Sequence, residues 1–135
     1  MTMASLHAGR GDEPIFQQET VGDVLVLTVV EDPTTSNYAS KQNEYNRLYR
    51  SLSEASRTHL LFNLHRCRIL DSVTIGILVS LTNVCRSGGG ESAMSGLSED
   101  VNGMLARLML LQPDNKRAMW QTFGTREDAL AALQS

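Results

Sequence analysis

Two different spacings of hydrophobic residues divide the chain into expected strands and helices. Short apolar runs bounded by turn residues predict strands near residues 15–21, 24–30, 59–64, 92–97 and 120–123. Apolar residues three or four positions apart predict helices near residues 38–56, 72–86 and 98–111, and a last helix from Thr125. A hairpin is therefore followed by alternating strands and helices.

This order of elements predicts a fold class. Strands that alternate with helices form parallel sheets with right-handed crossovers, and the opening hairpin makes the sheet mixed. We expect a single α/β domain with a mixed, mostly parallel sheet of four to five strands and about four helices. The chain has 135 residues. We assign residues 1–14 to a flexible tail and residues 15–135 to this domain.

Composition excludes several classes of function. Hydrophobic residues make up 41% and charged residues 20% of the chain, as in ordinary globular proteins. The net charge of −3 and the absence of a Lys/Arg cluster argue against nucleic-acid binding. No apolar run approaches the roughly 20 residues of a membrane helix, and residues 1–14 lack the apolar core of a signal peptide. We expect a cytoplasmic protein without direct membrane insertion.

The sequence shows no pattern typical of a catalytic or metal site. Cys67 and Cys85 have no further metal ligands at useful spacing. The glycines of Gly88–Gly90 end a helix, lack the Gly-Lys-Ser/Thr that holds a nucleotide, and do not follow a strand. The Gly-x-Ser-x-Gly motif of hydrolases is also absent. We therefore predict no catalytic residue, no metal, no cofactor and no enzymatic activity.

The dipeptide Asp71-Ser72 stands where the strand near 59–64 is followed by a helix. A hydroxyl in this position caps the helix by accepting a hydrogen bond from a free backbone N–H. The same position favours a covalently attached phosphate, because free N–H groups and the helix dipole stabilise negative charge. This position thus allows Ser72 to be either an N-cap or a phosphorylation switch.

A longer pattern surrounds this dipeptide. Asn63-Leu64 and the run from Leu70-Asp71-Ser72 to Gly76-Ile77-Leu78 resemble the signature of the STAS family, the sulphate-transporter and anti-sigma-factor-antagonist domains. The order of elements is similar from about Ile15 to the C-terminus. Val73 and Thr74 stand where the family has its second Ser and its first Gly, so the turn into the helix is built without that Gly.

The resemblance implies a STAS-like fold and a phosphorylation switch. In the bacterial antagonists the matching Ser is phosphorylated by an anti-sigma kinase, which implies Ser72 as the phosphoacceptor and Asp71 as the residue that shapes its loop. The implied partner is an anti-sigma factor or a serine kinase of the ATP-dependent type, and a phosphatase is a further candidate partner. The partner-binding residues expected here are Asp71, Ser72, Val73, Thr74, Gly76, Asp32 and Thr34, the last two from the loop after the second strand.

Three alternatives remain open at this point. Gly76, inside a helix, fits close packing against the sheet better than room for a docked partner. The domain could be a scaffold in a stress-signalling assembly or a transporter, with Ser72 acting only as a cap. An enzyme or small-ligand binder would use Asp71, Ser72 and His65, although no nucleophile–base spacing supports it. The oligomeric state does not follow from the sequence.

Overall fold

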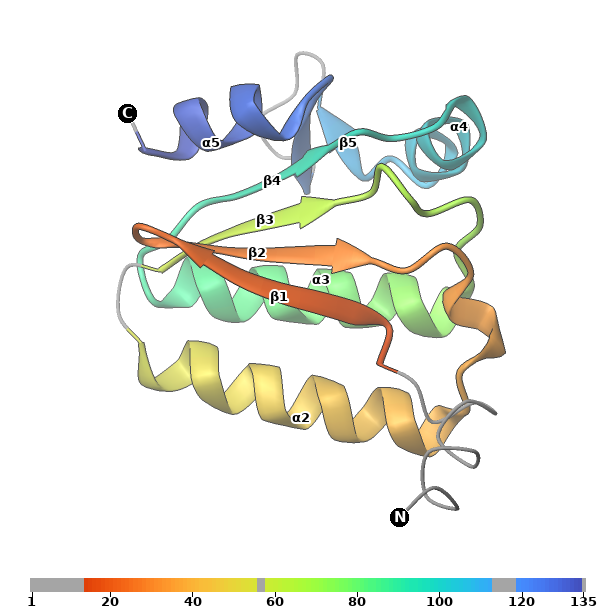
Figure 1. Ribbon diagram of the computed structural model, residues 1–135, viewed down its shortest axis with the longest axis horizontal. Coiled ribbons are helices and arrows are strands. Elements are labelled where there is room, and N and C mark those ends of the chain that lie inside the picture. Colours follow the sequence, from red (N-terminus) through yellow and green to blue (C-terminus); the bar gives the residue numbers. More distant parts are fainter. Residues whose placement is uncertain (1–13, 56–57, 113–118, 135) are drawn as a thin grey trace.

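The computed structural model describes residues 14–55, 58–112 and 119–134, and Figure 1 shows them as one sheet with helices packed against it. The strands are β1 (Phe16–Val21), β2 (Val24–Val29), β3 (His59–Asn63), β4 (Ser92–Ser95), β5 (Leu111–Gln112) and β6 (Trp120–Phe123). The helices are the short 3-10 turn η1 (Pro33–Thr35), α2 (Tyr38–Glu54), α3 (Ser72–Ser87), α4 (Glu99–Arg107) and α5 (Arg126–Gln134).

The sheet is mixed and mostly parallel, which confirms the predicted fold class. It has six strands in the described residues instead of the expected four to five, because Leu111–Gln112 adds the short strand β5. Its strand order is β1-β2-β3-β4-β6-β5. β1 is antiparallel to β2, as expected of a hairpin, and the other neighbouring strands are parallel. None of the helices in the described ranges is long and apolar enough to cross a membrane.

The segment after α4 differs from the sequence prediction. We expected the apolar face of this helix to extend as far as Leu111, but α4 ends at Arg107 and Leu111 begins the two-residue strand β5. Met109 has a positive φ of 61°, which breaks the helical path before the strand. The predicted helix break at residues 112–115 and the predicted tail at residues 1–14 lie mostly outside the described residues.

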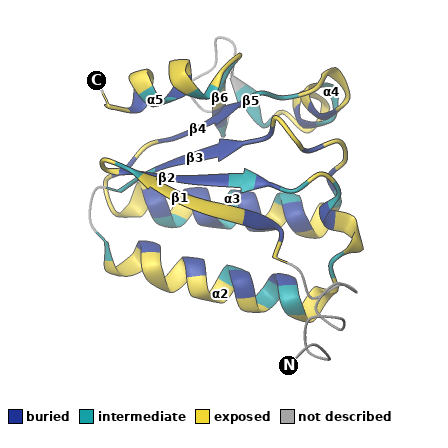
Figure 2. Cartoon of the chain, viewed as in Figure 1, coloured by how far each residue is buried: buried dark blue, intermediate teal, exposed yellow. Residues whose placement is uncertain are grey.

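Each face of the sheet has its own apolar cluster, because successive residues of a strand point to opposite sides. Leu27 and Phe62 belong to the larger cluster, which apolar residues of α2, α3 and α4 complete. Val26 and Leu61 belong to the smaller cluster, under Ala129 and Leu133 of α5. Figure 2 shows buried residues filling β2, β3 and β4 and the facing sides of α2 and α3, whereas β1 is largely exposed. Packing on both faces holds the strands in place. The loops that follow the strands therefore begin at defined positions.

The glycines at the end of α3 act as predicted, and for two different reasons. Gly89 has a φ of 90°, the left-handed conformation that commonly follows a helix, and its N–H donates to Arg86 O. A Cβ at Gly90 would lie 2.1 Å from the carbonyl oxygen of Thr58, so this backbone passes too close to β3 for any side chain.

Helix α2 buries two charged residues, Lys41 and Glu44, on its inner side together with Leu48 and Leu52. The sequence pattern placed Tyr38 on this buried side, but Tyr38 is 66% exposed and the prediction is wrong there. Charged groups are buried only when other groups satisfy them. Both residues therefore need partners from other elements.

Glu44 fixes the start of the first strand. Its Oε1 accepts a hydrogen bond from Ile15 N at 2.8 Å, and its Oε2 accepts one from Phe16 N at 3.0 Å. Burial raises the pKa of Glu44, although these two hydrogen bonds act in the opposite direction. The carboxylate thus connects α2 to β1 across nearly thirty residues of sequence.

We expect Glu44→Ala to lower the free energy of unfolding by about 2 kcal/mol, because two buried N–H groups lose their acceptors. Urea denaturation followed by circular dichroism measures this loss. Glu44→Gln retains one acceptor oxygen and should lose less. Asn46→Ala, on the exposed side of the same helix, serves as the control and should change little. Equal stability of Glu44→Ala and wild type would contradict the assigned role.

Candidate functional site

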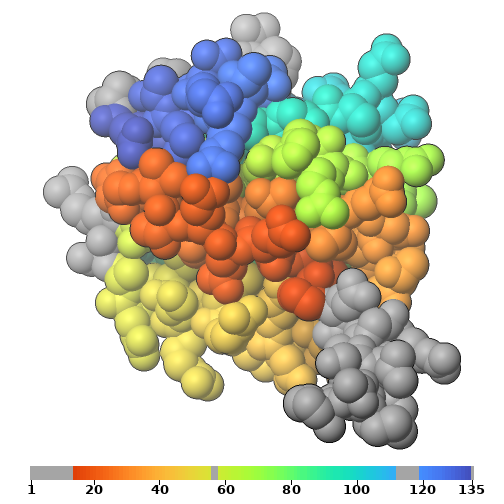
Figure 3. All heavy atoms as spheres, in the orientation of Figure 1, coloured from red at the N-terminus to blue at the C-terminus, as the bar shows by residue number. Residues whose placement is uncertain are grey.

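Three loops meet at the carboxyl ends of the parallel strands. They are residues 30–37 after β2, residues 64–71 after β3 and residues 96–98 after β4. Arg68 N donates to Glu31 O at 2.9 Å, which joins the first two loops, and Leu64 N donates to Ser95 O at 2.8 Å. Figure 3 shows the orange, yellow-green and cyan surfaces of these segments gathered at the right of the molecule. Ligand and partner sites of open α/β sheets commonly lie at this end of the strands.

Helix α3 begins in this region, and its N-cap is Asp71. The Asp71 Oδ1 accepts a hydrogen bond from Thr74 N at 2.8 Å, and Asp71 has an extended backbone as an N-cap requires. The alternative in which Ser72 is the cap is therefore wrong. Ser72 is the first helical residue, and it is exposed. Its hydroxyl makes no hydrogen bond to any of the residues that the structure describes.

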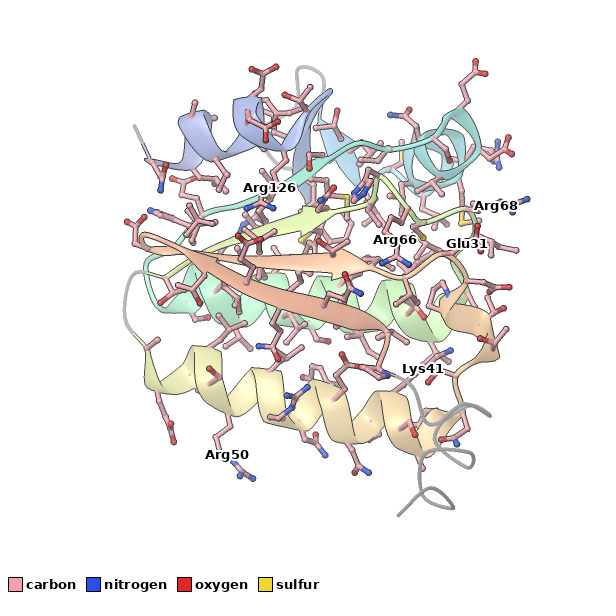
Figure 4. The ribbon with its side chains drawn as sticks, in the orientation of Figure 1. Glu31, Lys41, Arg50, Arg66, Arg68 and Arg126 are labelled. Carbon is pink, nitrogen blue, oxygen red and sulfur yellow. The ribbon has the colours of Figure 1, made fainter. Side chains whose placement is uncertain are left out.

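The other oxygen of the cap contacts a buried cation. Lys41 Nζ lies 2.7 Å from Asp71 Oδ2, and the two side chains are 5% and 31% exposed. Figure 4 shows Lys41 near the start of α3. Partial burial acts to raise the pKa of Asp71, but hydrogen bonds from Lys41 and Thr74 outweigh it and hold the pKa below its ordinary value. Asp71 is therefore a charged cap between α2 and α3.

The predicted partner-binding residues of α3 differ in exposure. Val73 is exposed, with 38% of its surface accessible, and lies beside Ser72 at the start of the helix. Thr74 is completely buried, so its side chain is not part of the surface, and its role here is to donate the N–H that Asp71 caps. The exposed first turn of α3 therefore consists of Ser72 and Val73.

Gly76 is one turn further along the helix and is also exposed. Apart from its chain neighbours and the backbone of its own helix, a Cβ added at Gly76 would have no described atom within 4 Å. Our interpretation that Gly76 permits close packing of the helix on the sheet is therefore wrong. Nothing within the fold requires a glycine here, although a glycine in a helix interior costs about 1 kcal/mol relative to alanine.

The loop after β2 carries the other two predicted contact residues. Asp32 caps η1, because its Oδ1 accepts hydrogen bonds from Thr34 N at 3.0 Å and from the Thr34 hydroxyl. Thr34 is exposed and Asp32 is partly exposed. A groove of about 520 Å³ runs from this loop to the start of α4, and its lining residues are Glu31, Asp32, Arg68, Ile69, Ser98 and Asp100.

Sequence reasoning missed several residues of this surface. Ile69, 46% exposed, lies in the groove between the Asp32 loop and α4, and Asp100 contributes a further carboxylate from α4. The Asp71 partner Lys41 was also missed, because thirty residues separate the two in sequence. The contribution of Asp100 from α4 could have been anticipated only from the rule that the carboxyl ends of parallel strands lie at the same edge of a sheet.

Among the described residues, no hydrogen bond joins His65 to Asp71 or Ser72, the other residues of the alternative enzyme site. His65 is exposed, and its Nδ1 lies 3.1 Å from Asn63 Oδ1. Burial raises the pKa of Cys67 to about 11, so its thiol is not a nucleophile at neutral pH. Among the described residues, no three His, Cys, Asp or Glu side chains could together hold a metal ion.

Comparison with known proteins identifies the family. A family model described as the STAS domain matches residues 16–129. The chain belongs to the STAS domain family. This confirms the resemblance that the Asp71-Ser72 segment suggested. A comparison of the sequence with curated proteins finds no match.

Solved structures have the same fold as this STAS domain. The anti-sigma factor antagonist SpoIIAA in its unphosphorylated form is 16% identical, with a TM-score of 0.71 over 88% of this chain and 96% of that chain. The phosphorylated form of SpoIIAA from Bacillus is 14% identical, with a TM-score of 0.64 over 87% and 97% of the two chains. The murine Solute Carrier 26 family member A9 anion transporter is 13% identical, with a TM-score of 0.60 over 86% of this chain and 18% of the transporter.

We expect Asp71→Asn to remove part of the pH dependence of stability. Because the pKa of Asp71 is lowered by folding, its stabilising effect is present above the unfolded pKa of about 3.9 and is lost as the pH falls through the folded value. Wild type should therefore exceed Asp71→Asn by about 1 to 2 kcal/mol at pH 7, and the difference should shrink below pH 4. Urea titrations between pH 7 and pH 2.5 measure it. Parallel curves for the two proteins would contradict the charged cap.

We expect Gly76→Ala to stabilise the isolated domain by about 0.5 to 1 kcal/mol, because the helix gains a better helix former and the new methyl group meets nothing. Thermal denaturation measures the change. Gly103→Ala in α4 is a matched control, since the nearest atom to its Cβ is Arg107 Nη1 at an ordinary 3.6 Å. A destabilised Gly76→Ala variant would contradict the open surroundings of Gly76.

Proposed function

We propose that this STAS domain is a phosphorylation-switched protein-binding module of the anti-sigma factor antagonist kind, with Ser72 as its phosphoacceptor. In the unphosphorylated state the surface formed by Ser72, Val73, Gly76 and the Asp32–Thr34 loop binds an anti-sigma factor kinase of the ATP-dependent type. Phosphorylation of Ser72 weakens that complex. A phosphatase would reverse the switch. The chain is the substrate of the modification and carries out no catalysis itself.

One observation carries this proposal. The capping role at the start of α3 belongs to Asp71, whose carboxylate accepts the Thr74 N–H, so the fold does not need the Ser72 hydroxyl. The hydroxyl is exposed at the first residue of a sixteen-residue helix, where a phosphate is favoured by the helix dipole. A kinase can therefore reach and modify it without unfolding the helix.

The negative charge of the surrounding surface explains why phosphorylation of Ser72 would weaken the binding of the partner. A phosphate adds about −1.5 to −2 charges at pH 7. The nearby groove already contains the carboxylates of Glu31, Asp32 and Asp100, opposed by the single cation of Arg68. Further negative charge in a docked interface must be desolvated and is repelled by these neighbouring carboxylates, which weakens binding.

The family relationship supports the class of partner that this switch requires. SpoIIAA is named as an anti-sigma factor antagonist and has been solved in unphosphorylated and phosphorylated forms. At 14% to 16% identity these structures share the fold with our chain, and the specific partner is part of the proposal. A cytoplasmic location follows from the same proposal, because a soluble kinase and ATP must reach Ser72.

We expect intact-mass and peptide mass spectrometry of the protein from its native host to find one phosphate, mapped to Ser72. The same protein carrying Ser72→Ala should lack this mass increase under growth and under stress. A wild-type protein that is unmodified in both conditions would contradict the switch.

We expect Ser72→Asp to raise the Kd for the host anti-sigma kinase at least about tenfold, which corresponds to about 1.4 kcal/mol. Calorimetry or surface plasmon resonance measures the Kd, and circular dichroism checks that the variant is folded. Ser72→Ala removes the hydroxyl without adding charge and is the control, so it should bind like wild type. A folded Ser72→Asp variant with unchanged affinity would rule out the electrostatic mechanism.

A scaffold role is the second candidate, and the structural match to the anion transporter favours it. In that case the domain would assemble in a stress-signalling complex or with a transporter, and Ser72 would carry no phosphate. Light scattering of the purified chain distinguishes the two, because a stable high-order oligomer favours a scaffold and a monomer or dimer favours the switch.

A further inference from the structure

The ammonium group that pairs with Asp71, the residue before the proposed phosphoacceptor, is buried. Lys41 has 5% of its side chain exposed, and its Nζ lies 2.7 Å from Asp71 Oδ2. Asp71 precedes Ser72 in the chain, and its second oxygen, Oδ1, caps the helix through Thr74 N at 2.8 Å. One carboxylate therefore joins a fixed positive charge on α2 to the first turn of α3.

The burial of Lys41 makes this positive charge unusually fixed. A surface lysine moves freely and is screened by salt, whereas a buried ammonium keeps its place and is screened much less. Within the described ranges, Asp71 is the only carboxylate that pairs with Lys41. The pair is neutral overall, so before modification the start of α3 has no excess charge from these two residues.

A phosphate on Ser72 changes this balance. It brings about −1.5 to −2 charges next to the Asp71 carboxylate. Without Lys41, Asp71 and the phosphate would together place close to three negative charges on a single helical turn. Asp71 would then be repelled from its capping position, and the first turn of α3 would lose the hydrogen bond to Thr74 N.

We propose that Lys41 is the internal counter-charge of the switch. It holds Asp71 in its capping position and removes one unit of the negative charge that Asp71 and a phosphate on Ser72 would together create, so that phosphorylation changes the surface and leaves the fold of α3 intact. Lys41 is a positioning residue, and it acts on Ser72 through Asp71. This inference rests on the proposed function, because it assigns to Lys41 a role in tolerating the modification of Ser72.

A double-mutant cycle tests the charge compensation. The proteins are wild type, Lys41→Met, Ser72→Glu and the double variant, with Glu as the stand-in for one phosphate charge, and the readout is the Tm in low salt at pH 7. We expect Ser72→Glu to shift the Tm by less than about 2 °C when Lys41 is present. In the Lys41→Met background the same change should lower the Tm by a further 3 °C or more, since roughly 1 kcal/mol shifts the Tm of a domain this size by a few degrees. High salt should reduce the difference.

Two further variants control the cycle. Arg50→Met removes an exposed cation from the same helix, and its cycle with Ser72→Glu should be additive. Lys41→Arg retains the charge and should preserve the tolerance of Ser72→Glu. Additive behaviour in the Lys41→Met cycle, or coupling of equal size in the Arg50 cycle, would overturn the proposal.

A second measurement keeps the proposal testable where Lys41→Met does not fold. Amide hydrogen exchange at Thr74, followed by NMR, reports directly on the Asp71 cap. We expect the Thr74 exchange rate of Ser72→Glu to stay within about threefold of wild type, because Lys41 holds Asp71 in place. An increase of tenfold or more would show that the cap is lost and would overturn the proposal.

Neither measurement uses a kinase or a partner protein, so the two proposals fail separately. If Ser72 is unmodified in the host, the double-mutant cycle still shows whether Lys41 offsets a negative charge at position 72. If Ser72 is phosphorylated but the cycle is additive, the switch stands and the role of Lys41 is refuted.

Discussion

The site depends on one carboxylate with two partners. Asp71 directs one oxygen to the backbone N–H of Thr74 and the other to the ammonium group of Lys41. The first contact determines where α3 begins, and the second fixes that starting point relative to α2. Asp71 fulfils the capping role, and Ser72 is exposed on the first turn of the helix. A similar division occurs at Glu44, whose two oxygens hold the start of β1.

The arrangement of the sheet could be predicted largely from hydrophobic spacing. The central strands β2 and β3 are continuous apolar runs because both their faces are covered, and such runs are easily recognised. Local spacing failed where tertiary contacts decide the outcome. Leu111 has the spacing of a helical residue, yet it pairs with Trp120 in the sheet. Tyr38 has the spacing of a core residue, yet it lies at the exposed beginning of α2.

The candidate site was partly visible in the sequence. The Asp-Ser dipeptide between a strand and a helix indicated the position of Ser72, but not which of the two residues is the cap. Lys41 was not predictable, because a lysine in an amphipathic helix ordinarily belongs to the solvated face and its partner is thirty residues away. The prediction for Gly76 was wrong for a related reason. Only the three-dimensional structure shows that no other part of the described chain packs against it.

The Lys41–Asp71 pair is difficult to explain by stability alone. Two apolar side chains of similar volume often stabilise a protein as well as a buried ion pair does, because the desolvation of two charges offsets much of their attraction. Apolar residues at these positions could pack, but they could not accept the Thr74 N–H or keep a fixed positive charge against Asp71. What the pair provides is a defined geometry and a local charge balance at the start of α3. The phosphorylation switch that we propose for Ser72 needs both properties, since its signal is useful only if the fold beneath it remains the same in the two states.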